Sequence, residues 1–155
     1  MDGFYGQFSV LMDKKGRISL PSRLRPSSMK ETKLSDEFIL TKGLDGCLAL
    51  YPENEWQLIQ QRLGSLNFTS RDYRYFSRLL HSVAVNINLD RQGRLLIPSH
   101  LQKDAGLTKE ILVIGVYRWI ELWNPDSYRD YLSRYGQSYE EVAEKLFDLN
   151  RGQED

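Results

Sequence analysis

The sequence predicts an α+β protein built from two copies of one structural unit. The stretch Asp13–Arg17 (Asp-Lys-Lys-Gly-Arg) returns 77 positions later as Asp90–Arg94 (Asp-Arg-Gln-Gly-Arg). An alternating apolar and polar segment precedes each stretch, and an apolar segment containing proline follows each one. Because the flanking patterns repeat together with the stretch, a chance repeat of five letters does not explain the match. Duplication of a whole unit does.

Each repeated stretch has the composition of a tight turn between two strands. Aspartate first and glycine fourth, as in Asp13 and Gly16, is typical of a type I turn closed by a residue with positive φ. The carboxylate can accept hydrogen bonds from the backbone of the turn, and glycine tolerates the left-handed conformation. The flanking patterns predict strands over Phe8–Met12 and Arg17–Leu20, paired as a hairpin with a basic tip.

The second copy repeats this arrangement. Strands are expected over Val83–Leu89 and Arg94–Ile97, with Asp90 and Gly93 shaping the turn. In each copy a proline, Pro21 or Pro98, then fits the first position of a short helix, where the missing N–H costs little.

The remainder of the first half predicts two more strands and two helices. The strands are expected over Glu37–Thr41 and Cys47–Tyr51, after a loop over Met29–Asp36. Pro52 begins the first helix, and Ser70 is a candidate N-cap of the second. The short segment Met1–Tyr5 is expected to be a leader outside the first strand.

The second half follows the same order with a shorter loop. Strands are expected over Ile111–Gly115 and Trp119–Trp123, with Ile120 and Trp123 at an offset of 72 from Leu48 and Tyr51. Asn124 with Pro125 begins a helix. Ser138 begins a final helix, for which the sequence shows no counterpart in the first half. These patterns place a first repeat at residues 4–56, connecting helices at 57–82, a second repeat at 83–132, and a C-terminal helix and tail at 133–155.

Composition bounds the function. The 155 residues carry 41% hydrophobic residues and no net charge, so the chain is not a uniformly basic coat for nucleic acid. Residues 14–33 nevertheless hold seven basic residues against one acidic, and residues 140–155 hold six acidic against two basic. The single cysteine, Cys47, excludes an intramolecular disulfide and is expected to be a buried apolar residue in a cytoplasmic protein. A membrane-spanning segment and a signal peptide are not expected.

Catalytic and metal-binding patterns are missing from the sequence, which predicts no enzyme, no cofactor and no metal site. The two histidines, His81 and His100, have neither metal-ligand spacing nor a nucleophile beside them. The paired aspartates Asp13 and Asp90 could form a carboxylate dyad. The bulky cations that follow each aspartate favour exposed turns instead.

The basic turns suit DNA. Arginine is the best bidentate donor to guanine in the major groove, lysine neutralises phosphate, and a two-stranded ribbon fits that groove. The candidate DNA-binding residues are Lys14, Lys15, Arg17, Arg91 and Arg94. Solvated turn residues are the alternative explanation, which Arg23 and Arg25 nearby make weaker.

With these motifs the chain resembles the MraZ family of bacterial proteins, whose halves are similar to AbrB-type swapped-hairpin DNA-binding units. The resemblance is carried by both Asp-x-x-x-Arg stretches with their apolar-Pro segments. It is also carried by Leu50-Tyr51-Pro52, Ala105-Gly106-Leu107 and Glu121-Leu122-Trp123. It implies a fold of duplicated swapped-hairpin β-barrel halves with peripheral helices.

The resemblance also implies a function. Members of the family are sequence-specific regulators that bind G-rich direct repeats in their own promoter and repress a cell-division and cell-wall gene cluster. They assemble into homo-oligomeric rings, octamers or dodecamers, and act in the cytoplasm on the nucleoid. Carried over to this chain, Arg17 would contact guanine, and Asp13 would hold the turn and orient Arg17. A ring-forming protein without specific DNA readout is the alternative, and an enzyme using Asp13 and Asp90 is a third.

Overall fold

The computed structural model describes residues 3–25 and 37–154, and side chains as far as residue 148. The predicted loop over Met29–Asp36 lies outside the described residues. The elements alternate between strands and helices as the sequence predicts. In chain order they are β1 (Phe4–Leu11), β2 (Arg17–Ser19), the 3-10 turn η1 (Ser22–Leu24), β3 (Glu37–Lys42), β4 (Leu48–Pro52), α1 (Glu53–Gly64), α2 (Arg71–Ser82), β5 (Val85–Asn88), β6 (Arg94–Leu96), α3 (Ser99–Asp104), β7 (Glu110–Tyr117), β8 (Ile120–Trp123), α4 (Pro125–Arg134) and α5 (Tyr139–Glu154).

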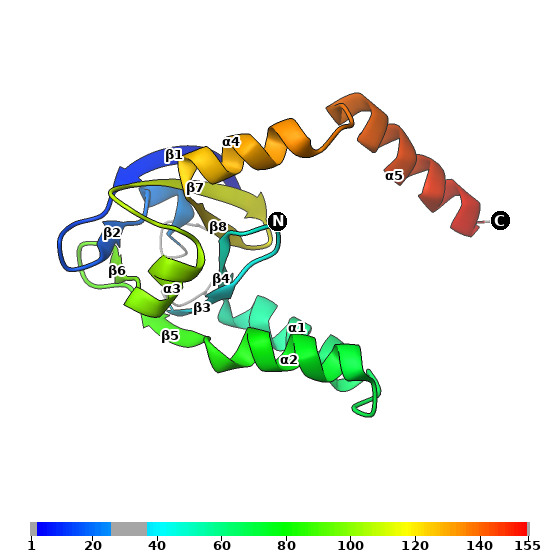
Figure 1. Ribbon diagram of the computed structural model, residues 1–155, viewed down its shortest axis with the longest axis horizontal. Coiled ribbons are helices and arrows are strands. Elements are labelled where there is room, and N and C mark those ends of the chain that lie inside the picture. The colour runs from blue at the N-terminus through cyan, green and yellow to red at the C-terminus, as the bar shows by residue number, and fades with distance from the viewer. Residues whose placement is uncertain (1–2, 26–36, 155) are drawn as a thin grey trace.

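The strands pair across the two halves. Six of them form an antiparallel sheet in the order β1-β7-β8-β4-β3-β5, and β2 pairs with β6 in a separate two-stranded ladder. Strand β1 of the first half therefore lies beside β7 of the second, and β5 of the second half lies beside β3 of the first (Figure 1). This exchange of first strands confirms the predicted fold class of two intertwined swapped-hairpin halves with peripheral helices.

The pairing also corrects one prediction. The strands on either side of each repeated turn do not form a hairpin ladder, because β1 and β2 belong to different sheets. The turn itself remains closed by two backbone hydrogen bonds, from Asp13 N to Arg17 O at 2.9 Å and from Gly16 N to Asp13 O at 3.0 Å. Apolar residues on both flanking strands find their partners in the opposite half, where they cover more apolar surface than a two-stranded ribbon could.

Matching registers show how closely the halves correspond. Phe38 of β3 lies opposite Ile87 of β5, and the equivalent pair in the other half is Ile111 with Val10. Strands β3 and β7 therefore correspond at an offset of 73. The predicted offset of 72 holds from β4 and β8 onward, where Leu48 pairs with Leu122 and Leu50 with Ile120. The connection between β7 and β8 is therefore one residue shorter than the connection between β3 and β4. Loops are where such a difference in length is expected.

The first strand begins earlier than the sequence predicted. Residues Phe4 and Tyr5, expected in a leader, pair with Tyr117 and Val116 of β7. Phe4 is buried, and its backbone passes so close to Gly115 that a Cβ there would lie 2.6 Å from the Phe4 carbonyl carbon. Residues this near the start of a chain are ordered when a long-range partner strand holds them, which short-range periodicity does not reveal.

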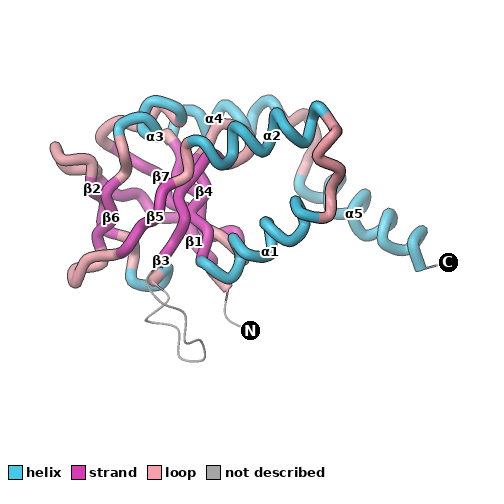
Figure 2. The backbone as a smooth tube through the Cα atoms, turned by 90° about the horizontal axis from the view of Figure 1, so that it is seen from below, coloured by secondary structure: helices cyan, strands magenta, loops and turns pink. Residues whose placement is uncertain are grey.

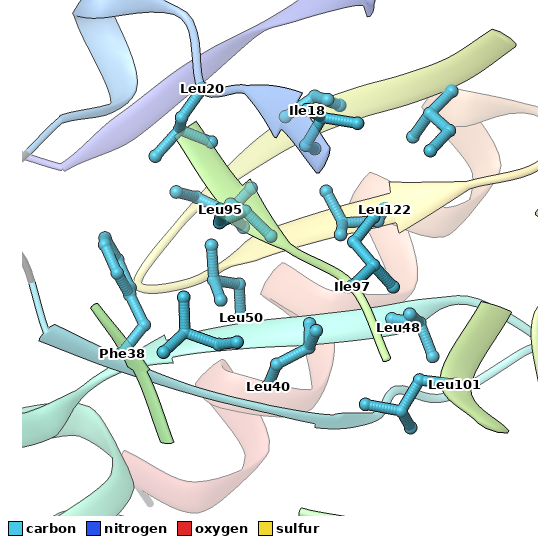
Figure 3. Packing of buried hydrophobic residues seen from close by; sticks show 14 of the residues in the cluster. Ile18, Leu20, Phe38, Leu40, Leu48, Leu50, Leu95, Ile97, Leu101 and Leu122 are labelled. Carbon is cyan, nitrogen blue, oxygen red and sulfur yellow. The ribbon is translucent and has the colours of Figure 1, made fainter. Parts of the chain in front are cut away.

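The core is built from the two repeated apolar-Pro segments. They contribute matching residues from the two halves of the chain, each at most 1% exposed. These residues are Ile18, Leu20, Leu24, Leu95, Ile97 and Leu101. Figure 3 shows five of them packed against Phe38, Leu40, Leu48, Leu50 and Leu122 of the six-stranded sheet. The segments that flank the turns therefore anchor them to the buried core of the molecule.

The helices begin where their predicted caps stand. Ser70 Oγ accepts from Tyr73 N at 3.3 Å, and Asn124 Oδ1 accepts from two amides of the first turn of α4. Cys47 is buried as predicted, and that burial raises the pKa of its thiol. By element order α5 follows α4 as α2 follows α1, so the final helix does have a topological counterpart.

The two ends of the molecule differ in character. Both repeated turns, beside β2 and β6, project from one end, whereas α1, α2 and α5 extend from the other (Figures 1 and 2). None of the helices in the described ranges is long and apolar enough to cross a bilayer.

Candidate nucleic-acid interface

The first turn, residues 13–17, is held by its own aspartate. Asp13 Oδ1 accepts hydrogen bonds from Lys15 N and Arg17 N, both at 2.9 Å, while Asp13 O accepts from Gly16 N at 3.0 Å. Gly16 has φ of +85°, the left-handed conformation that the sequence predicted. The other carboxylate oxygen, Oδ2, accepts from Arg17 Nε at 2.8 Å. One carboxylate thus fixes both the turn and its arginine.

The second turn, residues 90–94, repeats this geometry. Asp90 Oδ1 accepts from Gln92 N and Arg94 N at 2.9 Å, and Asp90 Oδ2 accepts from Arg94 Nε at 2.9 Å. Gly93 has φ of +76°. The arginine side chains of the two turns are each 32% exposed. The structure therefore presents two arginines in matched poses, each oriented by its own aspartate.

Electrostatics favour the ionised aspartates. The backbone N–H of Arg17 lowers the pKa of Asp13 most strongly. Desolvation opposes it, and the side chain of Arg17 and the backbone N–H of Lys15 lower the pKa further. Asp90 has a lowered pKa for the same reasons, with Arg94 in the place of Arg17. Both carboxylates therefore remain charged at neutral pH, and their charge-assisted hydrogen bonds hold the arginine side chains.

The remaining cations of the turns are exposed. Lys14 and Lys15 of the first turn and Arg91 of the second project into solvent. Because the Asp–Arg hydrogen bonds use Nε, the Nη1 and Nη2 groups of Arg17 and Arg94 are not engaged by the aspartates. Those two groups are the edge of a guanidinium that makes bidentate contact with guanine.

Each turn is fastened to the opposite half of the chain. Ile97 N donates to Gly16 O at 2.8 Å, and Leu20 N donates to Gly93 O at 2.9 Å. These two bonds lie on either side of the β2–β6 ladder, in which Arg17 pairs with Leu96. The ladder therefore fixes the position of one turn relative to the other.

Side chains from the opposite half also support the turns, and sequence reasoning did not assign them this role. Gln102 of α3 lies over the first turn, where its Nε2 would be 2.6 Å from a Cβ at Gly16 and donates to Ile97 O at 2.7 Å. Arg25, just after η1, lies over the second turn and would clash with a Cβ at Gly93. Arg25 Nε donates to Leu20 O at 2.8 Å.

Arg25 and Gln102 are 77 positions apart, the same offset as the turns, so the repeat itself was a signal for their equivalent places. The difference between them matters. Gln102 is neutral and adds no charge to the first turn. Arg25 brings a cation to the second turn, in which Gln92 stands where the first turn has Lys15.

The other candidate chemistry finds no support in the geometry. Asp13 and Asp90 each accept three hydrogen bonds inside their own turn, and both pKa values are lowered, whereas a shared-proton dyad requires one raised pKa. His81 Nδ1 lies 2.7 Å from Ser77 O, and His100 Nε2 lies 3.1 Å from Val83 O, so both rings bind backbone carbonyls. Within residues 3–25 and 37–154, no three metal-ligating side chains form a cluster.

Comparison with known proteins gives the family. The family model described as "MraZ protein, putative antitoxin-like" matches the chain twice, at residues 4–79 and 80–150. A protein of Pelotomaculum thermopropionicum named "Transcriptional regulator MraZ" is 45% identical over 149 residues, which cover 96% of this chain and 99% of that protein. A protein of Syntrophomonas wolfei with the same name is 42% identical over 146 residues, covering 94% and 98%.

The two matches of the family model coincide with the duplication seen in the fold, and the relatives align over nearly their whole length. Each match includes one Asp-x-x-x-Arg turn together with the helices that follow it. The chain therefore belongs to the MraZ family.

Proposed function

We propose that the protein is a sequence-specific DNA-binding transcriptional regulator that represses its own promoter. One observation carries the proposal. Two basic turns, each with an arginine held by an aspartate, project from the same end of the molecule and are fixed to one another by the β2–β6 ladder. The name of the relatives, transcriptional regulator, agrees with this proposal.

The contacts divide between readout and positioning. Arg17, with Nε bound to Asp13, directs its two Nη groups toward O6 and N7 of a guanine. Lys14 and Lys15 neutralise phosphates beside it. The second turn makes the equivalent contacts through Arg91 and Arg94. What enters the groove in this proposal is a tight turn and not a β-ribbon, because the flanking strands separate below it.

Self-assembly supplies the affinity. One subunit with zero net charge offers few phosphate contacts, so a single turn binds weakly. Several subunits on successive G-rich direct repeats gain by effective concentration. The proposal therefore includes a homo-oligomeric ring, an octamer or dodecamer, at a promoter of a cell-division and cell-wall gene cluster. It places the protein in the cytoplasm, associated with the nucleoid.

The test is fluorescence anisotropy of labelled DNA from upstream of the protein's own gene, at two salt concentrations. We expect the wild-type protein to prefer this DNA to a scrambled sequence, and Arg17→Ala to lose that preference. Arg129→Ala, which removes an exposed cation from α4, is the matched control and should bind as the wild type does.

Two outcomes would contradict the proposal. Binding with a steep salt dependence but no sequence preference reduces the function to nonspecific charge contact. Absence of binding at low salt leaves the ring-forming protein without DNA readout as the better description. The exposed apolar helix α5 favours that second candidate.

A further inference from the structure

The second turn is covered by a charged side chain from the first half of the chain. Arg25 Nε donates to Leu20 O at 2.8 Å, and the Arg25 guanidinium lies so close to Gly93 that an added Cβ there would clash with it. Leu20 N in turn donates to Gly93 O at 2.9 Å. Arg25, Leu20 and Gly93 therefore form a closed set of contacts that holds the second turn.

The first turn has the same arrangement with a neutral side chain. Gln102 Nε2 donates to Ile97 O at 2.7 Å and would lie 2.6 Å from a Cβ at Gly16. Ile97 N donates to Gly16 O at 2.8 Å. A primary amide thus makes the equivalent contacts without a charge. Support of the turn alone does not account for the guanidinium of Arg25, because a half-buried cation costs more to desolvate than an amide does.

The charges of the two turns differ in a way that Arg25 compensates. The first turn holds three cations and one carboxylate, whereas the second turn holds two cations and one carboxylate. The difference lies at one position, where the first turn has Lys15 and the second has Gln92. The covering residues reverse this difference, since Gln102 lies over the first turn and Arg25 over the second. Each turn taken with its covering residue therefore carries three cations.

The added cation lies beside the position that lacks one. Gly93, against which the Arg25 guanidinium lies, directly follows Gln92 in the chain. Gln92 and Arg91 are exposed, and their turn projects from the same end of the molecule as the first turn (Figure 1). Because arginine and lysine both neutralise phosphate, the same charge can be supplied from either place.

We propose that Arg25 is a phosphate-binding residue of the second turn, where it supplies the charge that Lys15 supplies in the first. The inference rests on the proposed DNA-binding function, to which it adds a residue that lies outside both turns. It makes the two turns equal in the number of phosphates that they can neutralise. Since phosphate contacts position a protein without reading bases, Arg25 contributes affinity, and the sequence preference stays with the arginines of the turns.

The chain itself suggests the variant that removes the charge and keeps the contact. Arg25→Gln introduces the residue that already covers the first turn, so its amide can still donate to Leu20 O. We expect the midpoint of urea unfolding to stay at the wild-type value. Affinity for a DNA with one operator repeat should fall on the order of tenfold at 0.1 M salt, and the slope of log K against log salt concentration should become shallower by about 1.

A second change tests whether charge is what Arg25 supplies. Gln92→Lys in the Arg25→Gln chain returns the third cation to the second turn, at the position where the first turn has it, so the affinity and the salt slope should return to wild-type values. Gln102→Arg alone adds a cation to the first turn and should steepen the slope by about 1. Arg129→Gln removes an exposed cation from α4 and is the control, for which no change in binding is expected.

Two results would overturn the inference. If Arg25→Gln keeps the wild-type affinity and salt slope, the guanidinium only supports the turn. If Arg25→Gln weakens binding and Gln92→Lys does not restore it, the loss comes from the shape of the turn and not from its charge.

Arg17→Ala in the same series separates this inference from the proposed function. If Arg17→Ala loses the sequence preference while Arg25→Gln binds as the wild type does, the DNA-binding regulator stands and the role of Arg25 does not. If the wild-type protein binds no DNA at low salt, the proposed function fails and the inference fails with it.

Discussion

The guanidinium of Arg25 lies over the Cα of Gly93, so a side chain from the first half closes the turn of the second half. Gln102 stands in the equivalent place over Gly16. Arg25 is 68 positions from Gly93 and Gln102 is 86 positions from Gly16, so each turn depends on a distant residue and the paired turns behave as one unit.

Changing Gly93 to alanine should destabilise the protein by about 1–3 kcal/mol, because alanine is strained at φ of +76° and its Cβ would clash with Arg25. The measurement is urea unfolding. In a double-mutant cycle, Arg25→Ala should relieve the part of the cost that comes from the clash. If the two changes add without coupling, Arg25 does not rest on Gly93. Gly64→Ala on α1, where an added Cβ meets nothing within 4 Å, is the control and should not destabilise.

Arg17→Ala should cost about 1–3 kcal/mol of binding free energy on the operator and relax its sequence preference, since the bidentate donor is lost. Arg17→Lys should not restore the preference. A lysine ammonium lacks the planar set of donors that lets a guanidinium hydrogen-bond Asp13 and two guanine acceptors at the same time. Lys14→Ala should instead weaken binding to all DNA sequences equally, and it should reduce the slope of log K against log salt concentration by about 1. Equal effects of Arg17→Ala on operator and scrambled DNA would contradict the assigned readout.

Titration of the two aspartates should show pKa values below the ordinary 3.8, as the hydrogen bonds from Arg17 and Arg94 require. Since the pKa is lowered in the folded state, the stabilisation is present above pH 3.8 and is lost as the pH falls through the folded value. Heteronuclear NMR of the carboxyl groups makes the measurement. Asp13→Asn should flatten the acid limb of the stability profile while the turn persists, because the amide oxygen still accepts from Lys15 N. A pKa at or above 3.8 would contradict the hydrogen bonds from Arg17 and Arg94 to the aspartates.

Arg118→Ala should destabilise the protein by about 1–2 kcal/mol, because it leaves the Glu55 carboxylate, only 10% exposed, without its 2.7 Å partner. This ion pair joins α1 of the first half to the β7–β8 turn of the second, so thermal unfolding should report it. The exposed pair Arg129–Asp126 provides the control, since Arg129→Ala should change stability by less than about 0.5 kcal/mol. Comparable losses in the two variants would show that burial of Glu55 does not matter.

Features that depend on a few neighbouring residues could be read from the sequence. The Asp–Gly turns, the helix caps at Ser70 and Asn124, and the buried apolar-Pro segments all stand where local composition predicted them. Turns and caps form when a side chain hydrogen-bonds to the backbone within four residues, so a short sequence motif is enough to specify them. The duplication was visible in the sequence because both copies retain those motifs.

Only the tertiary structure decided which segments meet. The choice of β7 and not β2 as the partner of β1, the start of β1 at Phe4, and the placing of Arg25 over Gly93 all join residues far apart in the chain. Local periodicity shows which face of a strand is apolar, but the partner is set by which pairing buries the most surface in both halves together. For the same reason the sequence predicted α2 as a helix, while its place beside β3, where Thr41 Oγ1 donates to Leu80 O, exists only in the folded chain.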